Sequence, residues 1–142
     1  MKATIILLTV FFVTITLIPK IESGEEMKNQ LKNKLAVLWT SGDPEVAHKV
    51  CFMYTYNAKK QGWFDEVVLI VWGPSAKLLA EDDSLKTKIR AMKKDGVILE
   101  ACKACADMYE VSGDLEKLGI DVKYMGVPLS DMLKQDWKVL TF

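Results

Sequence analysis

The sequence has few of the residues from which most catalytic sites are built. It has one histidine, His48, so a site that needs two imidazoles cannot form within the chain. Its three cysteines are too few for a disulfide scaffold, and one must stay unpaired in a monomer. The sequence has no G-x-G-x-x-G motif, P-loop or H-E-x-x-H motif, so nucleotide cofactors and metalloprotease chemistry have no support.

An excess of charge of one sign is also lacking. Nineteen Lys and Arg residues balance nineteen Asp and Glu residues, so no basic or acidic footprint indicates a nucleic-acid partner. Half of the residues are hydrophobic and 27% are charged, which is typical of a folded globular chain and excludes disordered and low-complexity classes. The 142 residues suffice for one domain.

The first 23 residues differ in composition from the rest. Residues 3–19 carry no charge and no glycine, and they lie between Lys2 and Lys20. A short basic start and an apolar core are typical of a secretory signal, and Ser23 offers a small residue before a cleavage point. As a helix the run would span roughly 25 Å of a bilayer core of about 30 Å, so an N-terminal membrane anchor stays open as an alternative.

We therefore predict an exported protein, periplasmic or otherwise extracytoplasmic, that meets a membrane only through residues 1–23 if these are retained. Residues 24–33 are polar and are predicted to form a linker. The folded domain is predicted to cover residues 34–142.

In this domain, short apolar runs alternate with helical patterns. Continuous apolar runs are typical of strands buried on both faces, and helices show apolar residues at a period of 3.6. Asp43 is the predicted N-cap of the first helix, and Pro44 its first residue. The pattern predicts strands over 35–40, 67–72, 97–102, 120–124 and 137–142, and helices over 44–61, 76–80, 85–94, 103–109, 113–118 and 128–133.

Alternation of this kind predicts an α/β fold: a single doubly wound domain with a mainly parallel five-stranded sheet and helices on both faces. Ligands of such sheets gather at the carboxyl ends of the strands. The loops after the first three strands, 40–44, 72–75 and 101–105, therefore hold the candidate site. The residues predicted to line it are Ser41, Gly42, Asp43, Gly73, Pro74 and Lys103.

The C-x-x-C pair of Cys102 and Cys105 is the strongest local feature. Cys102 is predicted where the third strand gives way to a helix, so free backbone N–H groups and the helix dipole would favour its thiolate. Lys103 adds a neighbouring cation, whereas Glu100, on the same side of the strand, acts in the opposite direction. The alternative for both cysteines is that they only pack in the core. For Cys105 this alternative has as much support as a functional role.

Other readings of the polar residues have less support. Zinc would need Cys51 and His48, but Cys51 falls on the apolar stripe of the first helix, so we predict no metal site and no cofactor. A thioredoxin-like dithiol has the right strand-to-helix placement, although Ala101 stands where those proteins usually have an aromatic residue. His48 is expected on a helix surface. Ser75 is expected to cap a helix, because no G-x-S-x-G motif surrounds it.

Taken together, residues 35–142 resemble the DsrE/DsrF-like (YchN-like) family of small sulfur-handling proteins. The matching parts are Ser41-Gly42-Asp43 after the first strand, Gly73-Pro74 after the second, Cys102 at the end of the third and the closing strand, 137–142. The resemblance implies a compact α/β fold, a homotrimer or homohexamer, and a cysteine that carries persulfide sulfur between proteins. Cys102 matches that cysteine by position. Cys105 is an extra, and well-studied members are cytoplasmic, unlike the exported protein predicted here.

Three hypotheses follow. The first is a sulfur carrier or sulfurtransferase-like protein in which Cys102 accepts sulfane sulfur from an unidentified donor protein and Cys105 resolves the persulfide. The second is an extracytoplasmic thiol–disulfide redox protein that uses Cys102 and Cys105. The third is a non-catalytic oligomeric binding module. A homo-oligomer is also favoured by Phe52, Met53 and Tyr56, which fall outside the main apolar stripe of the first helix and predict a second covering surface.

Overall fold

The computed structural model describes residues 33–142. Within them no helix is long and apolar enough to cross a membrane. The predicted signal or anchor, 1–23, and nearly all of the predicted linker, 24–33, lie outside the described residues. The elements are β1 (Lys34–Trp39), α2 (Pro44–Val46), the π-helical segment η1 (Ala47–Cys51), α3 (Phe52–Lys60), β2 (Glu66–Val71), α4 (Pro74–Glu81), α5 (Asp83–Lys94), β3 (Ile98–Cys102), α6 (Lys103–Met108), α7 (Ser112–Lys117), β4 (Asp121–Lys123), α8 (Gly126–Lys134) and β5 (Lys138–Thr141).

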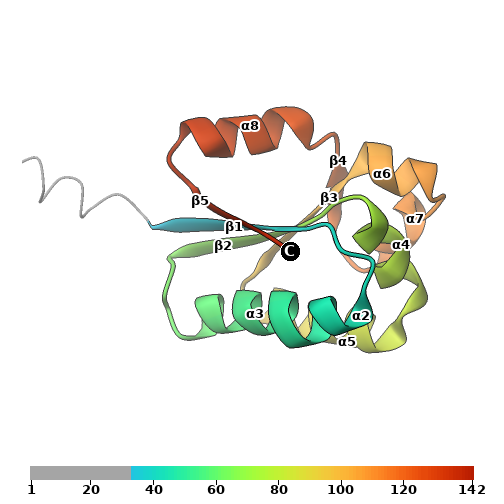
Figure 1. The fold of residues 1–142 in the computed structure, drawn as a ribbon, viewed down its shortest axis with the longest axis horizontal. Coiled ribbons are helices and arrows are strands. Elements are labelled where there is room, and N and C mark those ends of the chain that lie inside the picture. The colour runs from blue at the N-terminus through green and yellow to red at the C-terminus, as the bar shows by residue number, and fades with distance from the viewer. Residues whose placement is uncertain (1–32) are drawn as a thin grey trace, which may run out of the picture. The chain divides into compact units, whose positions relative to one another are not determined.

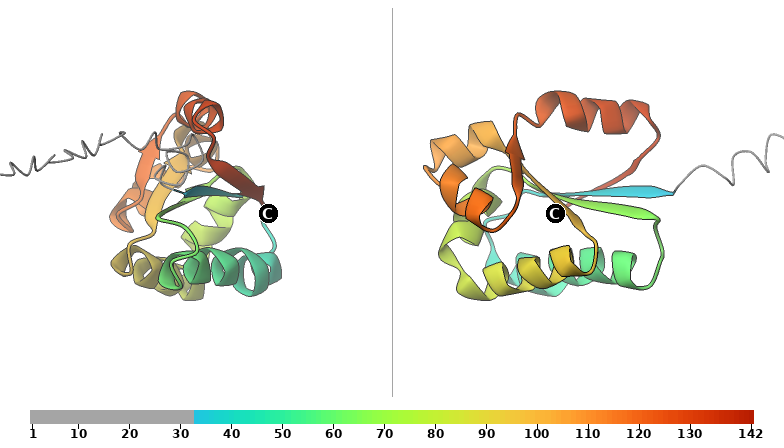
Figure 2. Two further views of the ribbon diagram at one scale, coloured as in Figure 1. Left: turned by 90° about the vertical axis from the view of Figure 1, so that its left-hand side faces the viewer. Right: turned by 180° about the vertical axis from the view of Figure 1, so that it is seen from behind.

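The five strands form one parallel sheet in the order β4-β3-β2-β1-β5. The chain builds the sheet from β1 outward to β4 and then crosses back, so that β5 pairs with the free side of β1 (Figure 1). Helices α3 and α5 cover one face of the sheet, and α8 covers the other (Figures 1 and 2). The predicted α/β fold with helices on both faces is therefore confirmed.

The apolar runs of the central strands are buried on both faces. Leu35, Val37 and Trp39 of β1 belong to the core beneath α3 and α5. Ala36 of the same strand belongs to a second, smaller cluster on the α8 face, together with Met125. Because neighbouring side chains of a strand point to opposite faces, a strand covered on both sides reads as a continuous apolar run.

The first helix begins as predicted but is not uniform. The Asp43 carboxylate accepts the backbone N–H of Glu45 at 2.8 Å, and Pro44 takes the first helical position. One turn later the chain is π-helical, and the N–H of Phe52 donates to the carbonyl of Ala47, five residues back. Sequence periodicity missed this segment, because a single widened turn inside a helix is too short to be recognised from the residue pattern.

Ser75 does not cap α4 as predicted. Gly73 is the N-cap, and the Ser75 side chain is buried between the ends of β1 and β2. Its hydroxyl donates to the carbonyl of Trp39 at 2.6 Å and accepts the N–H of Trp72 at 3.0 Å. The hydroxyl therefore links the carboxyl ends of the two central strands, β1 and β2, by hydrogen bonds.

We expect Ser75→Ala to lower the free energy of unfolding by about 1–2 kcal/mol, because it removes two hydrogen bonds made by a buried group. Urea unfolding followed by tryptophan fluorescence measures the change. Ser130→Ala removes an exposed hydroxyl that bonds only within α8, and it should change the free energy by less than about 0.5 kcal/mol. Equal effects of the two substitutions would contradict the assigned role of Ser75.

Candidate functional site

The loops that follow β1 and β2 meet at the carboxyl edge of the sheet. A Cβ atom placed on Gly42 would lie 3.2 Å from the Cβ of Pro74, so the two loops approach more closely than larger side chains would permit. The Ser41 hydroxyl accepts the N–H of Asp43 at 3.1 Å, and the Asp43 carboxylate caps α2. These polar groups shape the first loop, and Gly42 allows it to lie close to the second.

Cys102 lies where the sequence predicts it. It is the last residue of β3 and the N-cap of α6, and its side chain makes no capping hydrogen bond. The residue is only 5% exposed and packs in the cluster that contains Met125, on the α8 face of the sheet. The thiol at this position is therefore a buried one. The following helix α6 has only six residues, so its dipole is smaller than that of a long helix.

Cys105 is the more exposed of the two thiols. Its side chain packs against the cluster that contains Cys102, near the Cys102 thiol and the backbone N–H of Gly73. Partial burial raises the pKa of Cys105, and the hydrogen bond with Cys102 raises it further, while the Gly73 N–H acts in the opposite direction. All three cysteines of the chain are in the free form. The structure thus brings the predicted pair into direct contact.

Gly73 connects the second loop to this thiol pair. Its φ of +69° and ψ of −137° belong to a region that is open to glycine and strained for other residues. This backbone turns the Gly73 N–H toward Cys105 and starts α4 at Pro74. Gly73 therefore belongs to the site through its backbone.

The Lys103 side chain interacts with residues other than Cys102. Its ammonium donates to both carboxylate oxygens of Asp107, at 2.9 and 2.7 Å, and lies 6.0 Å from the ring centre of Tyr124. The Asp107 carboxylate raises the pKa of Lys103 and thereby keeps it charged. Lys103 is the cation next to Cys102 in the sequence, and its ammonium is bonded to Asp107.

A different lysine faces the strand that carries Cys102, and sequence reasoning missed it. Lys123 pairs in register with Cys102, and Glu100 pairs with Asp121. The Lys123 ammonium donates to Glu100 and to Asp121, at 2.7 Å in each case. Glu100 is 8% exposed, and its second carboxylate oxygen has no hydrogen-bond partner within residues 33–142. The register between two short strands is not visible in a sequence, which is why Lys123 was not a candidate.

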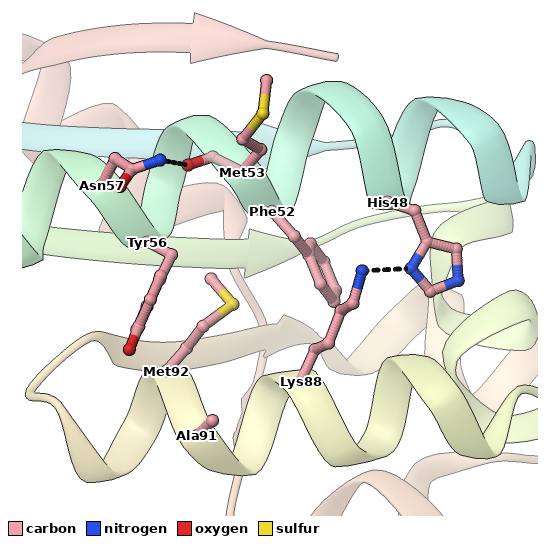
Figure 3. Close-up of a pocket in the computed structure, with 8 residues that line it drawn as sticks. All are labelled: His48, Phe52, Met53, Tyr56, Asn57, Lys88, Ala91 and Met92. Atoms are coloured by element: carbon pink, nitrogen blue, oxygen red, sulfur yellow. Dashed lines mark hydrogen bonds between the residues drawn. The ribbon is translucent and has the colours of Figure 1, made fainter.

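The remaining candidates have structural roles. Cys51 is buried in the core beneath the first helix, and burial raises its pKa to about 12, with a hydrogen bond to Thr55 acting in the opposite direction. Its thiol is therefore protonated and unreactive at neutral pH. His48 is half-buried and hydrogen-bonded to Lys88 in a groove between α3 and α5 (Figure 3). Within residues 33–142 no three His, Cys, Asp or Glu side chains gather as they would around a metal ion.

The fold and the site together define a small α/β protein with a thiol pair at the carboxyl edge of a parallel sheet. The model of the DsrE/DsrF-like family matches residues 33–142, and the chain belongs to this family. Its five-stranded parallel sheet is accordingly the α/β fold of the DsrE/YchN-like type.

Two of the solved structures that resemble the chain come from Bacteroides thetaiotaomicron and E. coli. A conserved protein of unknown function from Bacteroides thetaiotaomicron, BT1422, is 37% identical, with a TM-score of 0.75, over 78% of this chain and 95% of that one. The ychN protein from E. coli is 16% identical, with a TM-score of 0.63, over 78% of this chain and 99% of that one, which shows a shared fold. Comparison with curated proteins gives no match.

The raised pKa of Cys105 predicts slow alkylation at neutral pH. Below its pKa the thiol form predominates, and the reactive thiolate increases about tenfold for each pH unit. We therefore expect the rate of Cys105 labelling by iodoacetamide to keep rising above pH 9.0, the ordinary value for such a thiol. Peptide-level mass spectrometry at a series of pH values measures the rate, and Cys51 should stay unlabelled throughout. A rate that is already constant from pH 7 would contradict the prediction.

Proposed function

We propose that this protein is a sulfur carrier in which Cys102 accepts sulfane sulfur as a persulfide and passes it to a partner's thiol. The observation that carries the proposal is the contact between two free thiols at the carboxyl edge of β3. Membership of the DsrE/DsrF-like family supports it. Sulfur transfer requires a nucleophilic thiol and few other groups, which suits this site.

The transfer balances without a cofactor. The Cys102 thiolate attacks the outer sulfur of a donor persulfide, R–S–SH. The S–S bond of the donor breaks, R–S⁻ leaves, and Cys102 becomes Cys–S–SH. An acceptor thiolate then attacks the outer sulfur of this persulfide and regenerates the Cys102 thiolate. Each step is a thiol–disulfide type exchange, whose rate depends on the attacking thiolate and on its accessibility.

The surroundings of Cys102 favour storage of such a group. The residue is 5% exposed within an apolar cluster, which limits the contact of its own sulfur with water. Cys105 can resolve the persulfide. Its thiolate attacks the inner sulfur, a Cys102–Cys105 disulfide forms, and hydrosulfide leaves. A reducing thiol is then needed to restore the pair.

Loading with a small sulfane donor tests the proposal. After incubation with glutathione persulfide and removal of the donor, we expect the intact mass to increase by one sulfur atom. Cys102→Ser should abolish this gain, and Cys51→Ser should leave it unchanged. Cys105→Ser should keep the persulfide and prolong its lifetime, because the resolving thiol is gone. A gain that persists in Cys102→Ser but disappears in Cys105→Ser would assign the carrier role to Cys105 and contradict the proposal.

A thiol–disulfide redox role is the second candidate, and the same contact between Cys102 and Cys105 favours it. A dithiol of this kind would cycle with a disulfide of defined reduction potential. Equilibration in glutathione buffers, with the disulfide fraction measured by mass spectrometry, distinguishes the two functions. Reversible oxidation in the range of known oxidoreductases, without uptake of sulfane sulfur, would replace the first proposal by this one.

We also propose that the protein assembles as a homo-oligomer, a trimer or a pair of trimers. Phe52 was expected to need cover from a second subunit, and this expectation is wrong. The residue is 2% exposed and is covered by its own subunit. The support comes from large apolar side chains that a monomer leaves exposed, such as Tyr124 (68%) and Val127 (72%).

Analytical ultracentrifugation at micromolar concentration tests this assembly. We expect one species heavier than a monomer and expect Val127→Glu to shift it toward the monomer, because the new carboxylate would be buried at a contact. Leu133→Glu, on the last turn of the same helix, serves as a comparison variant. A monomer in the unsubstituted protein would contradict the proposal. Export remains a prediction that rests on residues 1–23.

A further inference from the structure

A groove between α3 and α5 is separate from the thiol pair. It has a volume of about 380 Å³, and the side chains of Phe52 and Tyr56 on one wall reach toward those of Lys88 and Met92 on the other (Figure 3). Phe52 and Met92, which line it, belong to the core on the α3 and α5 face of the sheet. Cys102 belongs to the cluster on the α8 face. The groove is therefore a second feature of the fold, and the sulfur proposal makes no use of it.

The deepest part of the groove is apolar. Phe52 and Met92 are each 2% exposed, so they form a closed floor. Tyr56 stands above this floor and donates to the Asp95 carboxylate, so its hydroxyl is occupied and its ring forms one end of the groove. Such a surface binds a hydrocarbon or aromatic body by removing it from water.

The other end of the groove carries a positive charge. The Lys88 ammonium lies 2.8 Å from Nδ1 of His48. An ammonium can only donate, so Nδ1 is the acceptor of this contact, and the other ring nitrogen, Nε2, lies 3.8 Å from the Asp82 carboxylate. No carboxylate within residues 33–142 forms an ion pair with Lys88, whereas the neighbouring Lys86 pairs with Asp83 at 2.8 Å. The Lys88 ammonium is thus bonded to an imidazole nitrogen instead of a carboxylate, and its other N–H groups can donate to an anion.

The backbone at this end is irregular as well. His48 lies in the π-helical segment η1, which ends immediately before Phe52. A π-helical turn contains an additional residue and changes the direction of the side chains on either side of it. Segments of this kind occur frequently at functional sites. Here the segment contributes the imidazole that holds Lys88 at the mouth of the groove.

From these features we infer that the groove binds a small amphipathic anion, with its apolar body over Phe52 and Met92 and its carboxylate or sulfonate group on Lys88. A volume of 380 Å³ corresponds to about a dozen water-sized groups, which fits a short aliphatic or aromatic acid. A ligand with a cationic head would meet the unpaired charge of Lys88.

Titration of the isolated protein with 8-anilinonaphthalene-1-sulfonate, an aromatic body with one sulfonate, tests the inference. We expect saturable binding with one probe per subunit. Lys88→Met should weaken this binding by about three- to tenfold, because it removes a charge-assisted hydrogen bond, and Lys88→Arg should restore most of it. Lys86→Met is the matched control on the same helix and should have no effect. The neutral probe N-phenyl-1-naphthylamine should bind the unsubstituted protein and Lys88→Met equally.

Two further measurements locate the probe. The ε-methyl NMR signal of Met92 should shift on titration, and that of Met125, on the other face of the sheet, should not. Ala91→Trp should block binding, because Ala91 lines the groove at an exposed position where a large side chain leaves the core intact. Cys102→Ser should leave binding unchanged, so this test and the sulfur-loading test fail independently.

Three results would overturn the inference. The first is the absence of saturable binding to the unsubstituted protein. The second is binding that Lys88→Met and Ala91→Trp both leave unchanged. The third is dissociation of an oligomer by Ala91→Trp, observed in the ultracentrifuge, which would show that a second copy of the chain covers the groove.

Discussion

The parallel pairing of β1 with β2 is the constraint on which the rest of the structure depends. Six consecutive residues of each strand are in register, from Lys34 opposite Glu66 to Trp39 opposite Val71. This register fixes where both strands end, and Ser75 bonds those ends to each other. The loop with Gly42 and the loop with Gly73 can approach each other only because the strands before them stop at the same level. Gly73 in turn reaches Cys105, so the thiol pair depends on the position of the central strands.

Much of the fold could be predicted from local sequence. Strands buried on both faces are continuous apolar runs, and turns are marked by Pro and Gly, so the five strands and the position of Cys102 follow from residues close together in the chain. The contact between Cys102 and Cys105 is local in the same sense, because the two residues are separated by one helical turn. Exposure is different. It depends on what covers a residue, and nothing near Cys102 in the sequence shows that it is buried on the α8 face.

The features that sequence reasoning missed involve residues far apart in the chain. Lys123 lies opposite Cys102 only through the register of β3 with β4, and Lys88 meets His48 only through the packing of α5 on the first helix. Lys103 was the cation closest to Cys102 in the sequence, but it is one turn away from Asp107 and bonds to that carboxylate instead. Proximity in sequence thus did not predict which charged side chain lies near Cys102. A lysine side chain is long and flexible, so it can pair with any carboxylate within several ångströms.

The two faces of the sheet are covered by different helices, and this difference affects how accessible the thiols are. One helix, α8, lies over the face that holds Cys102 (Figure 1). None of its residues is fully buried, and it packs on the sheet through half-buried side chains such as Leu129 and Met132. Local opening costs least where the fewest apolar contacts are lost. Lifting α8 therefore requires less free energy than separating the central strands, and this opening would remove part of the cover of the cluster that holds Cys102, where Ala104 and Cys105 of α6 also pack.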